Sequence, residues 1–98
     1  MPDEEESGEL SDEELDLFGF ISSSERRSAV VSELLESPQT PKNLAENTDI
    51  RINHVSNVLA ELESEKIVTC VNPDRQRGRV YKLTPVGKKV ASRHFSNE

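Results

Sequence analysis

The chain has 98 residues, of which 33% are hydrophobic, and it contains no Trp. This length provides one hydrophobic core, which must be built mainly from aliphatic side chains. A domain of this size buries only about 60 to 65 percent of its unfolded surface, which favours self-association. The single cysteine, Cys70, excludes an intramolecular disulfide and a zinc site of the paired-cysteine kind. No apolar run approaches the roughly 20 residues of a membrane span, so a soluble, cytoplasmic protein is expected.

The formal net charge of −7 is distributed unevenly. Residues 1–16 contain nine acids and no base, which leaves ten acids and twelve bases in the rest of the chain. We therefore expect an acidic disordered tail over residues 1–10 and one folded domain over residues 11–98. The tail has three interpretations: a solubilising segment, an adaptation to high salt, or a competitor of nucleic acid for the basic body. The basic body itself favours contact with nucleic acid.

Three helices are predicted in the first half of the chain, over residues 12–21, 24–36 and 41–47. The first follows Ser11, which forms a capping-box pattern with Glu14. The third follows Thr40, whose hydroxyl can cap the helix, and proline at the next position fits the first helical turn. A short connection over residues 48–50 then leads into a fourth helix.

This fourth helix lies within residues 49–67. Val55, Leu59 and Leu62 recur at a spacing of four and three residues, so they form an apolar stripe, flanked by Ile52 and Val58, that must pack on the core.

The opposite face of the fourth helix is polar and uncharged. Asn53 and Asn57 lie about 160 to 200 degrees from the centre of the stripe, at roughly 100 degrees per residue. Residues 50–60 contain no carboxylate, although 19 of the 98 residues are acidic. Such a face favours a polyanionic partner. The alternative is a half-buried helix whose outer side is simply hydrated.

The second half of the chain changes to a β pattern. Residues 67–72 and 79–84 are rich in β-branched side chains and predict two strands. The intervening Pro73-Asp-Arg-Gln-Arg-Gly segment is typical of a turn, so the strands form a hairpin. Thr84-Pro85 repeats the cap-and-proline pattern and begins a last helix over residues 85–94. The predicted fold is mainly α with a small β-hairpin (α+β), in the order helix, helix, helix, helix, strand, strand, helix.

The hairpin tip opens the longest acid-free stretch of the chain. Residues 75–97 contain no carboxylate and seven bases, of which Arg75, Arg77 and Arg79 alternate across the tip. Such arginines can reach phosphates or enter a minor groove. The alternative is an ordinary charged turn that keeps an exposed hairpin soluble. Two separate acid-free stretches, however, fall on the two elements that one DNA-binding architecture requires.

The two stretches also carry a family resemblance. The run LAENTDIRINHVSNVLAELESEKIV resembles the helix-turn-helix of winged-helix transcriptional regulators of the ArsR and MarR type. The run RGRVYKLTPVGKKVA resembles their wing strand, LT-x-x-G junction and final helix. The similarity covers about residues 24–91, and it implies that Leu44 and Ala45 pack the first helix of the unit while Ile50 closes the turn.

Three departures from the family pattern are informative. Asp49 stands where such turns often have glycine, and aspartate tolerates the left-handed backbone better than most residues. Arg51 stands where a Ser or Thr cap is common, which weakens the cap but places a cation near the phosphates. The thiol motif of the metal-sensing members is missing, so no metal or other cofactor is expected. The short N-terminal helix and acidic head resemble small haloarchaeal and archaeal-virus regulators.

The resemblance and the geometry together assign roles to nine residues. Asn53 and Asn57 are the first choices for base contacts, because asparagine can pair bidentately with adenine. The other expected contacts on the recognition helix are a base edge or phosphate for His54, phosphates for Arg51 and Ser56, and a thymine methyl for Ile52 if it is exposed. On the wing, Arg75, Arg77 and Arg79 are expected to hold the DNA backbone.

The resulting hypothesis is a sequence-specific double-stranded DNA-binding transcriptional regulator. We expect a homodimer on an inverted repeat, paired through the helix around residues 15–21, the last helix around residues 86–90, or both. A repressor is expected because a chain this short leaves no room for an activating or ligand domain, and no small-molecule ligand is evident. No catalytic constellation is recognisable, so an enzyme is not expected. The alternative is a winged-helix protein-interaction module in a transcription or partition complex.

Overall fold

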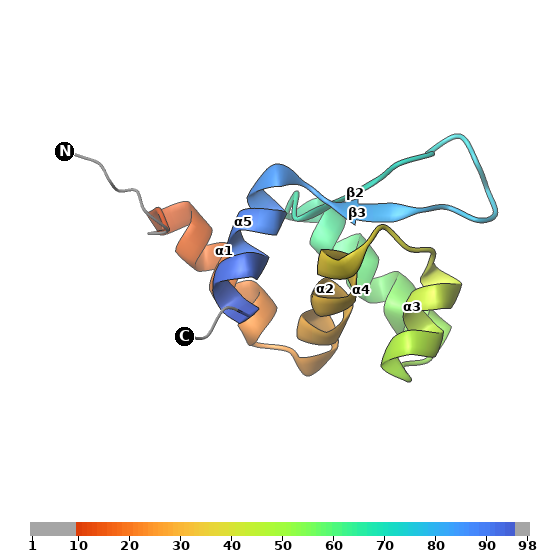
Figure 1. Ribbon diagram of the computed structural model, residues 1–98, viewed down its shortest axis with the longest axis horizontal. Coiled ribbons are helices and arrows are strands. Elements are labelled where there is room, and N and C mark those ends of the chain that lie inside the picture. Colours follow the sequence, from red (N-terminus) through yellow and green to blue (C-terminus); the bar gives the residue numbers. More distant parts are fainter. Residues whose placement is uncertain (1–9, 96–98) are drawn as a thin grey trace.

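The computed structural model describes residues 10–95 (Figure 1). This part of the chain is mainly helical, with one antiparallel pair of strands, in the predicted order. The elements are α1 (Asp12–Ser22), α2 (Glu25–Glu36), α3 (Pro41–Thr48), α4 (Ile52–Ser64), β2 (Val68–Cys70), β3 (Tyr81–Leu83) and α5 (Pro85–Phe95). The tail predicted over residues 1–10 lies outside the described residues, apart from Leu10, which belongs to no helix or strand.

The predicted helix starts are confirmed. The Ser11 hydroxyl accepts from the backbone N–H of Glu14 at 3.1 Å, and the Glu14 carboxylate accepts from the backbone N–H of Ser11 at 3.0 Å. Thr40 caps α3 by accepting from the Asn43 backbone N–H at 3.1 Å. Each cap satisfies donors that the first helical turn leaves without partners, and so fixes where the helix begins.

The turn between α3 and α4 is three residues long and depends on Asp49. Its backbone is left-handed, with φ of 62°, as expected for a residue standing in a glycine-like position. Arg51 is the N-cap of α4 and makes no side-chain capping hydrogen bond. Arg51 is exposed, and it stands at the positive end of the helix dipole.

The end of α4 shortens the first predicted strand. Lys66 adopts a left-handed backbone, with φ of 63°, and the backbone N–H of Ile67 bonds to the carbonyl of Leu62 at 2.9 Å. This is the pattern of a Schellman motif, which glycine usually closes. Ile67 thus belongs to the helix cap, and β2 begins one residue later than predicted.

The strands pair with Val68 opposite Leu83 and Cys70 opposite Tyr81. Beyond the predicted hairpin, Gln39 forms an isolated bridge to Tyr81, with backbone hydrogen bonds of 3.0 and 2.9 Å. The Gln39 side chain also donates to the Glu33 carbonyl of α2, at 2.8 Å. The α2–α3 connection therefore links the base of the hairpin to α2 through hydrogen bonds. No sequence pattern predicts this link.

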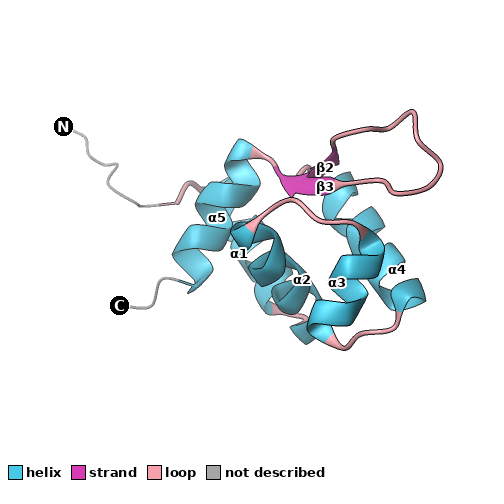
Figure 2. Cartoon of the chain, turned by 45° about the vertical axis from the view of Figure 1, so that its right-hand side comes forward, coloured by secondary structure: helices cyan, strands magenta, loops and turns pink. Residues whose placement is uncertain are grey.

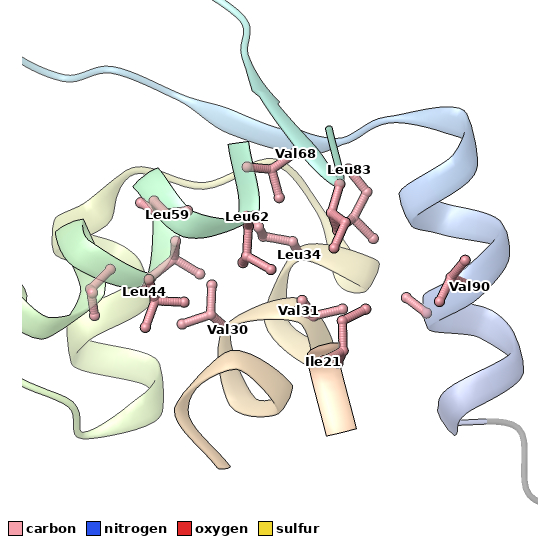
Figure 3. Close-up of a cluster of buried hydrophobic side chains, with 14 residues drawn as sticks. Ile21, Val30, Val31, Leu34, Leu44, Leu59, Leu62, Val68, Leu83 and Val90 are labelled. Carbon is pink, nitrogen blue, oxygen red and sulfur yellow. The ribbon is translucent and has the colours of Figure 1, made fainter. Parts of the chain in front are cut away.

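The core is aliphatic, as predicted, and all the side chains that are buried within residues 10–95 are apolar (Figure 3). The stripe on α4 supplies Val55, Leu59 and Leu62, with Val58 beside them. Ile52 does not flank the stripe in the core, because it is 52% exposed at the start of the helix. That expectation was wrong. The Ile52 side chain is instead accessible from solvent.

Helices α1 and α5 pack on each other at the end of the molecule opposite the hairpin tip (Figures 1 and 2). Ile21 and Val90, expected near a dimer contact, are fully buried inside the fold of the single chain, whereas Leu15 remains 53% exposed. Lys89 of α5 forms an ion pair with Glu14 of α1 at 3.1 Å. The Ser11 backbone N–H and the Lys89 ammonium together hold the pKa of the Glu14 carboxyl below its usual value.

Arg27 ties the α1–α2 junction to α4. Its guanidinium donates to the Phe20 carbonyl at 3.0 Å and to Glu61 at 3.1 Å, and it lies 3.8 Å from the centroid of the Phe20 ring. We expect Arg27→Ala to lower the free energy of unfolding by about 1 to 2 kcal/mol, measured by urea denaturation. The neighbouring exposed Arg26→Ala is the control and should change it by less than about 0.5 kcal/mol. Equal effects of the two substitutions would contradict the assignment.

Within residues 10–95, no helix combines the length and the apolar character that a membrane crossing requires.

Candidate nucleic-acid interface

The outward face of α4 is open to solvent along its first two turns. Burial of Val55, Val58 and Leu59 fixes the rotation of the helix against the core. The remaining residues of these turns are therefore directed away from it. His54 is half-buried, and the predicted contact residues that are exposed are Arg51, Ile52, Asn53, Ser56 and Asn57.

Asn53 and Asn57 lie one helical turn apart on this face. Four residues of α-helix correspond to about 6 Å along the helix axis, close to the roughly 7 Å rise of two base-pair steps. Both residues are exposed, and the hydrogen bonds found among residues 10–95 involve neither of their side chains. Both amides thus keep the donor and the acceptor that recognition of an adenine edge requires.

The first turn of α4 contains no acidic residue. The backbone N–H groups at a helix N-terminus carry a partial positive charge and favour anions. Arg51 adds a full positive charge at the same end of the helix. This end of α4 therefore has the electrostatic character of a phosphate contact.

The hairpin tip carries the three predicted wing arginines, and all three are exposed. Two of them, Arg75 and Arg77, have side chains that take part in no ion pair or hydrogen bond within residues 10–95. Arg79 differs, because its guanidinium donates to the carbonyls of Arg75, at 2.6 Å, and Pro73, at 3.2 Å. Among the described residues, the tip thus presents two cations without a protein partner and one that holds the loop.

A groove of about 580 Å³ separates the hairpin tip from the N-terminal ends of α3 and α4. It is lined by Thr40, Pro41, Lys42, Ile52, Ser56, Gln76, Arg77, Gly78, Arg79 and Tyr81. None of these residues is acidic and three are basic, in a chain of 19 acids. The groove is therefore lined by basic and apolar side chains, from helix ends and a loop that lie far apart in sequence.

The groove brings four of the nine predicted contact residues together: Ile52, Ser56, Arg77 and Arg79. Of the other five, four belong to the first two turns of α4 and its N-cap, and Arg75 belongs to the tip loop. Four polar groove residues were missed by sequence reasoning: Thr40, Lys42, Gln76 and Tyr81. Thr40 was recognised only as a helix cap, and no local pattern signals that the start of α3 faces the hairpin.

Comparison with known proteins gives no relative. No protein-family model matches the chain, and neither the curated proteins nor the solved structures include a significant match. The chemistry of this surface is therefore the basis on which a function can be proposed.

The acid-free C-terminal stretch divides between two surfaces of the molecule. Arg77 and Arg79 of the tip border the groove beside α4, whereas Lys82, Lys88 and Lys89 line a separate hollow of about 510 Å³ between β3 and α5. Lys89 is already paired there with Glu14. The basic residues that form one stretch in the sequence thus lie on two surfaces. Of these two surfaces, the one formed by the hairpin tip adjoins α4.

Metal binding has no evident site in the part of the chain that the structure describes. No three His, Cys, Asp or Glu side chains within residues 10–95 come close enough together to hold an ion. Cys70 is half-buried, and its thiol lies 3.6 Å from the Asn72 side-chain oxygen.

Proposed function

We propose that the protein is a winged-helix transcriptional regulator that binds double-stranded DNA in a sequence-specific manner. In this proposal α3 and α4 form the helix-turn-helix, α4 enters the major groove, and the β2–β3 hairpin is the wing. A homodimer binds an inverted repeat and acts as a repressor. Repression by occupying an operator needs no surface beyond the one that binds DNA.

The observation that carries the proposal is the carboxylate-free groove between α4 and the hairpin tip. The major groove of B-DNA, about 12 Å wide, admits an α-helix, and one phosphate strand separates it from the adjacent minor groove. A loop beside such a helix must therefore straddle that strand. The Ser56 hydroxyl and the charges of Lys42 and Arg77 border the space that the strand would occupy.

The arrangement of the helices is compatible with a dimer that leaves this surface free. Helices α1 and α5 lie at the far end of the molecule from the hairpin tip (Figure 1), and α1 exposes Leu15 there. A two-fold contact at that end would direct two copies of α4 toward half-sites about 34 to 36 Å apart, or a multiple of that distance.

A second candidate is a winged helix that binds another protein. Ile52 and Val71 are large apolar residues that are 52% and 51% exposed, and apolar side chains at that exposure also suit a protein contact. The same fold serves both functions, because function depends on the surface and not on the architecture.

Selection of bound sequences from random duplex DNA, at a low and a moderate salt concentration, tests the two candidates. We expect enrichment of an inverted repeat at both concentrations and weaker overall retention at the higher one, because released counterions oppose binding as salt rises. Retention without enrichment would reject sequence-specific recognition. If no duplex is retained at either concentration, DNA binding is rejected and the protein-binding candidate is favoured.

Arg77→Ala should weaken binding to all DNA sequences alike. Loss of one phosphate contact is expected to reduce affinity roughly threefold to tenfold and to flatten the plot of log affinity against log salt by about one unit. Fluorescence anisotropy across a salt series measures both quantities. The matched control is Lys88→Ala, which removes the same charge from the hollow beside α5 and should leave the slope unchanged. If Lys88→Ala moves the slope and Arg77→Ala does not, the assignment of the wing is wrong.

A further inference from the structure

The hairpin tip is closed by the side chain of Asn72. Its oxygen accepts from the backbone N–H of Val80 at 2.8 Å, and its nitrogen donates to the carbonyl of Gly78 at 3.2 Å. The backbone carbonyl of the same residue accepts from Arg75 at 3.0 Å and forms a turn. The half-buried side-chain amide of Asn72 thus links the two sides of the loop, outside the paired residues of the strands.

Arg79 forms a second brace across the same loop. Its Nε donates to the Arg75 carbonyl at 2.6 Å and its terminal Nη2 donates to the Pro73 carbonyl at 3.2 Å. These two donors point along different directions of one planar group, which the single ammonium of lysine cannot reproduce. Arg75 and Arg77 therefore lie on a loop whose backbone is held by hydrogen bonds from the side chains of Asn72 and Arg79.

We propose that Asn72 and Arg79 are positioning residues that fix the shape of the tip so that Arg75 and Arg77 meet the DNA backbone. This inference rests on the proposed function and deepens it. A loop that is ordered before binding loses less conformational entropy on binding, so its contacts contribute more to affinity. Arg79 acts through the loop backbone, whereas Arg77, which lines the groove, makes the contact.

Charge-conserving substitutions separate positioning from phosphate contact. Arg79→Lys keeps the charge but loses the two-pronged brace, so affinity for the selected duplex should fall roughly threefold to tenfold with an unchanged salt slope. Arg77→Lys, the matched control, keeps a phosphate-binding charge and should bind within about twofold of wild type. Asn72→Ala removes no charge and should behave like Arg79→Lys. Wild-type affinity in Arg79→Lys and Asn72→Ala would overturn the proposal.

A second measurement needs no DNA. The ¹⁵N heteronuclear NOE of residues 74–78 reports nanosecond order of the tip and should fall in Asn72→Ala and Arg79→Lys but not in Arg77→Lys. The thermal midpoint should change little in all three, since the exposed tip adds little to the core. A lower midpoint with unchanged tip order and unchanged affinity would show a merely structural role and overturn the proposal. If wild-type protein binds no duplex, the proposed function fails, while the NOE still decides whether these residues order the tip.

Discussion

Alanine at both Asn53 and Asn57 is expected to reduce the preference for the selected sequence over random duplex by on the order of a hundredfold. Each bidentate contact to a base contributes about 1 to 3 kcal/mol of discrimination, and about 1.4 kcal/mol corresponds to a factor of ten. Both side chains are exposed on the face of α4 that burial of Val55 and Leu59 turns outward. Competition binding of selected and random duplexes measures the ratio.

Affinity for random duplex and the salt slope should stay close to wild type in this double variant, because neither amide carries a charge. Stability should not fall, since alanine has a higher helix propensity than asparagine and neither side chain has a partner within residues 10–95. The opposite outcome is expected for Arg77→Ala: the salt slope should change, whereas the preference for the selected sequence should not. Full discrimination in the double variant would mean that the outward face of α4 does not read the bases.

Gly87→Ala is expected to lower the free energy of unfolding by about 3 kcal/mol. Gly87 is buried in the first turn of α5, and a Cβ there would lie 2.1 Å from the backbone oxygen of Ile67. That oxygen already accepts from the backbone N–H of Thr84 at 2.9 Å. The backbone at Ile67 and the start of α5 therefore cannot move apart without breaking this hydrogen bond. The thermal midpoint should fall by roughly 10 to 20 °C for a domain of this size.

Gly19→Ala is the control for this substitution. Gly19 lies within α1 and is exposed, and a Cβ there meets nothing within 4 Å. Alanine should therefore raise the free energy of unfolding by roughly 0.5 to 1 kcal/mol, because the unfolded chain loses freedom and no contact is strained. Thermal unfolding of the two variants side by side gives opposite signs. A midpoint in Gly87→Ala that matches wild type would show that the close contact with Ile67 is not present in solution.

The candidate site was partly predictable from local patterns. The period of α4 placed Asn53 and Asn57 opposite the apolar stripe, and this rotation is what the structure shows. The prediction that Ile52 packs beside the core was wrong. Ile52 begins α4 and is exposed, so the first turn of the helix extends beyond the packed surface at that position. The tip arginines were predictable as a group, but only the loop hydrogen bonds distinguish Arg79 from Arg75 and Arg77.

Local sequence patterns were enough to predict the order of the helices and strands and the side of α4 that faces solvent. Capping hydroxyls, prolines at helix starts and the spacing of apolar residues act within a few positions of each other, so they can be recognised along the chain. The folded chain was needed to show that the hairpin tip faces the starts of α3 and α4 across a groove. It was also needed to show that basic residues of the C-terminal stretch divide between two surfaces. Those relations depend on contacts between residues far apart in sequence, such as the bridge from Gln39 to Tyr81, and no local sequence pattern predicts such contacts.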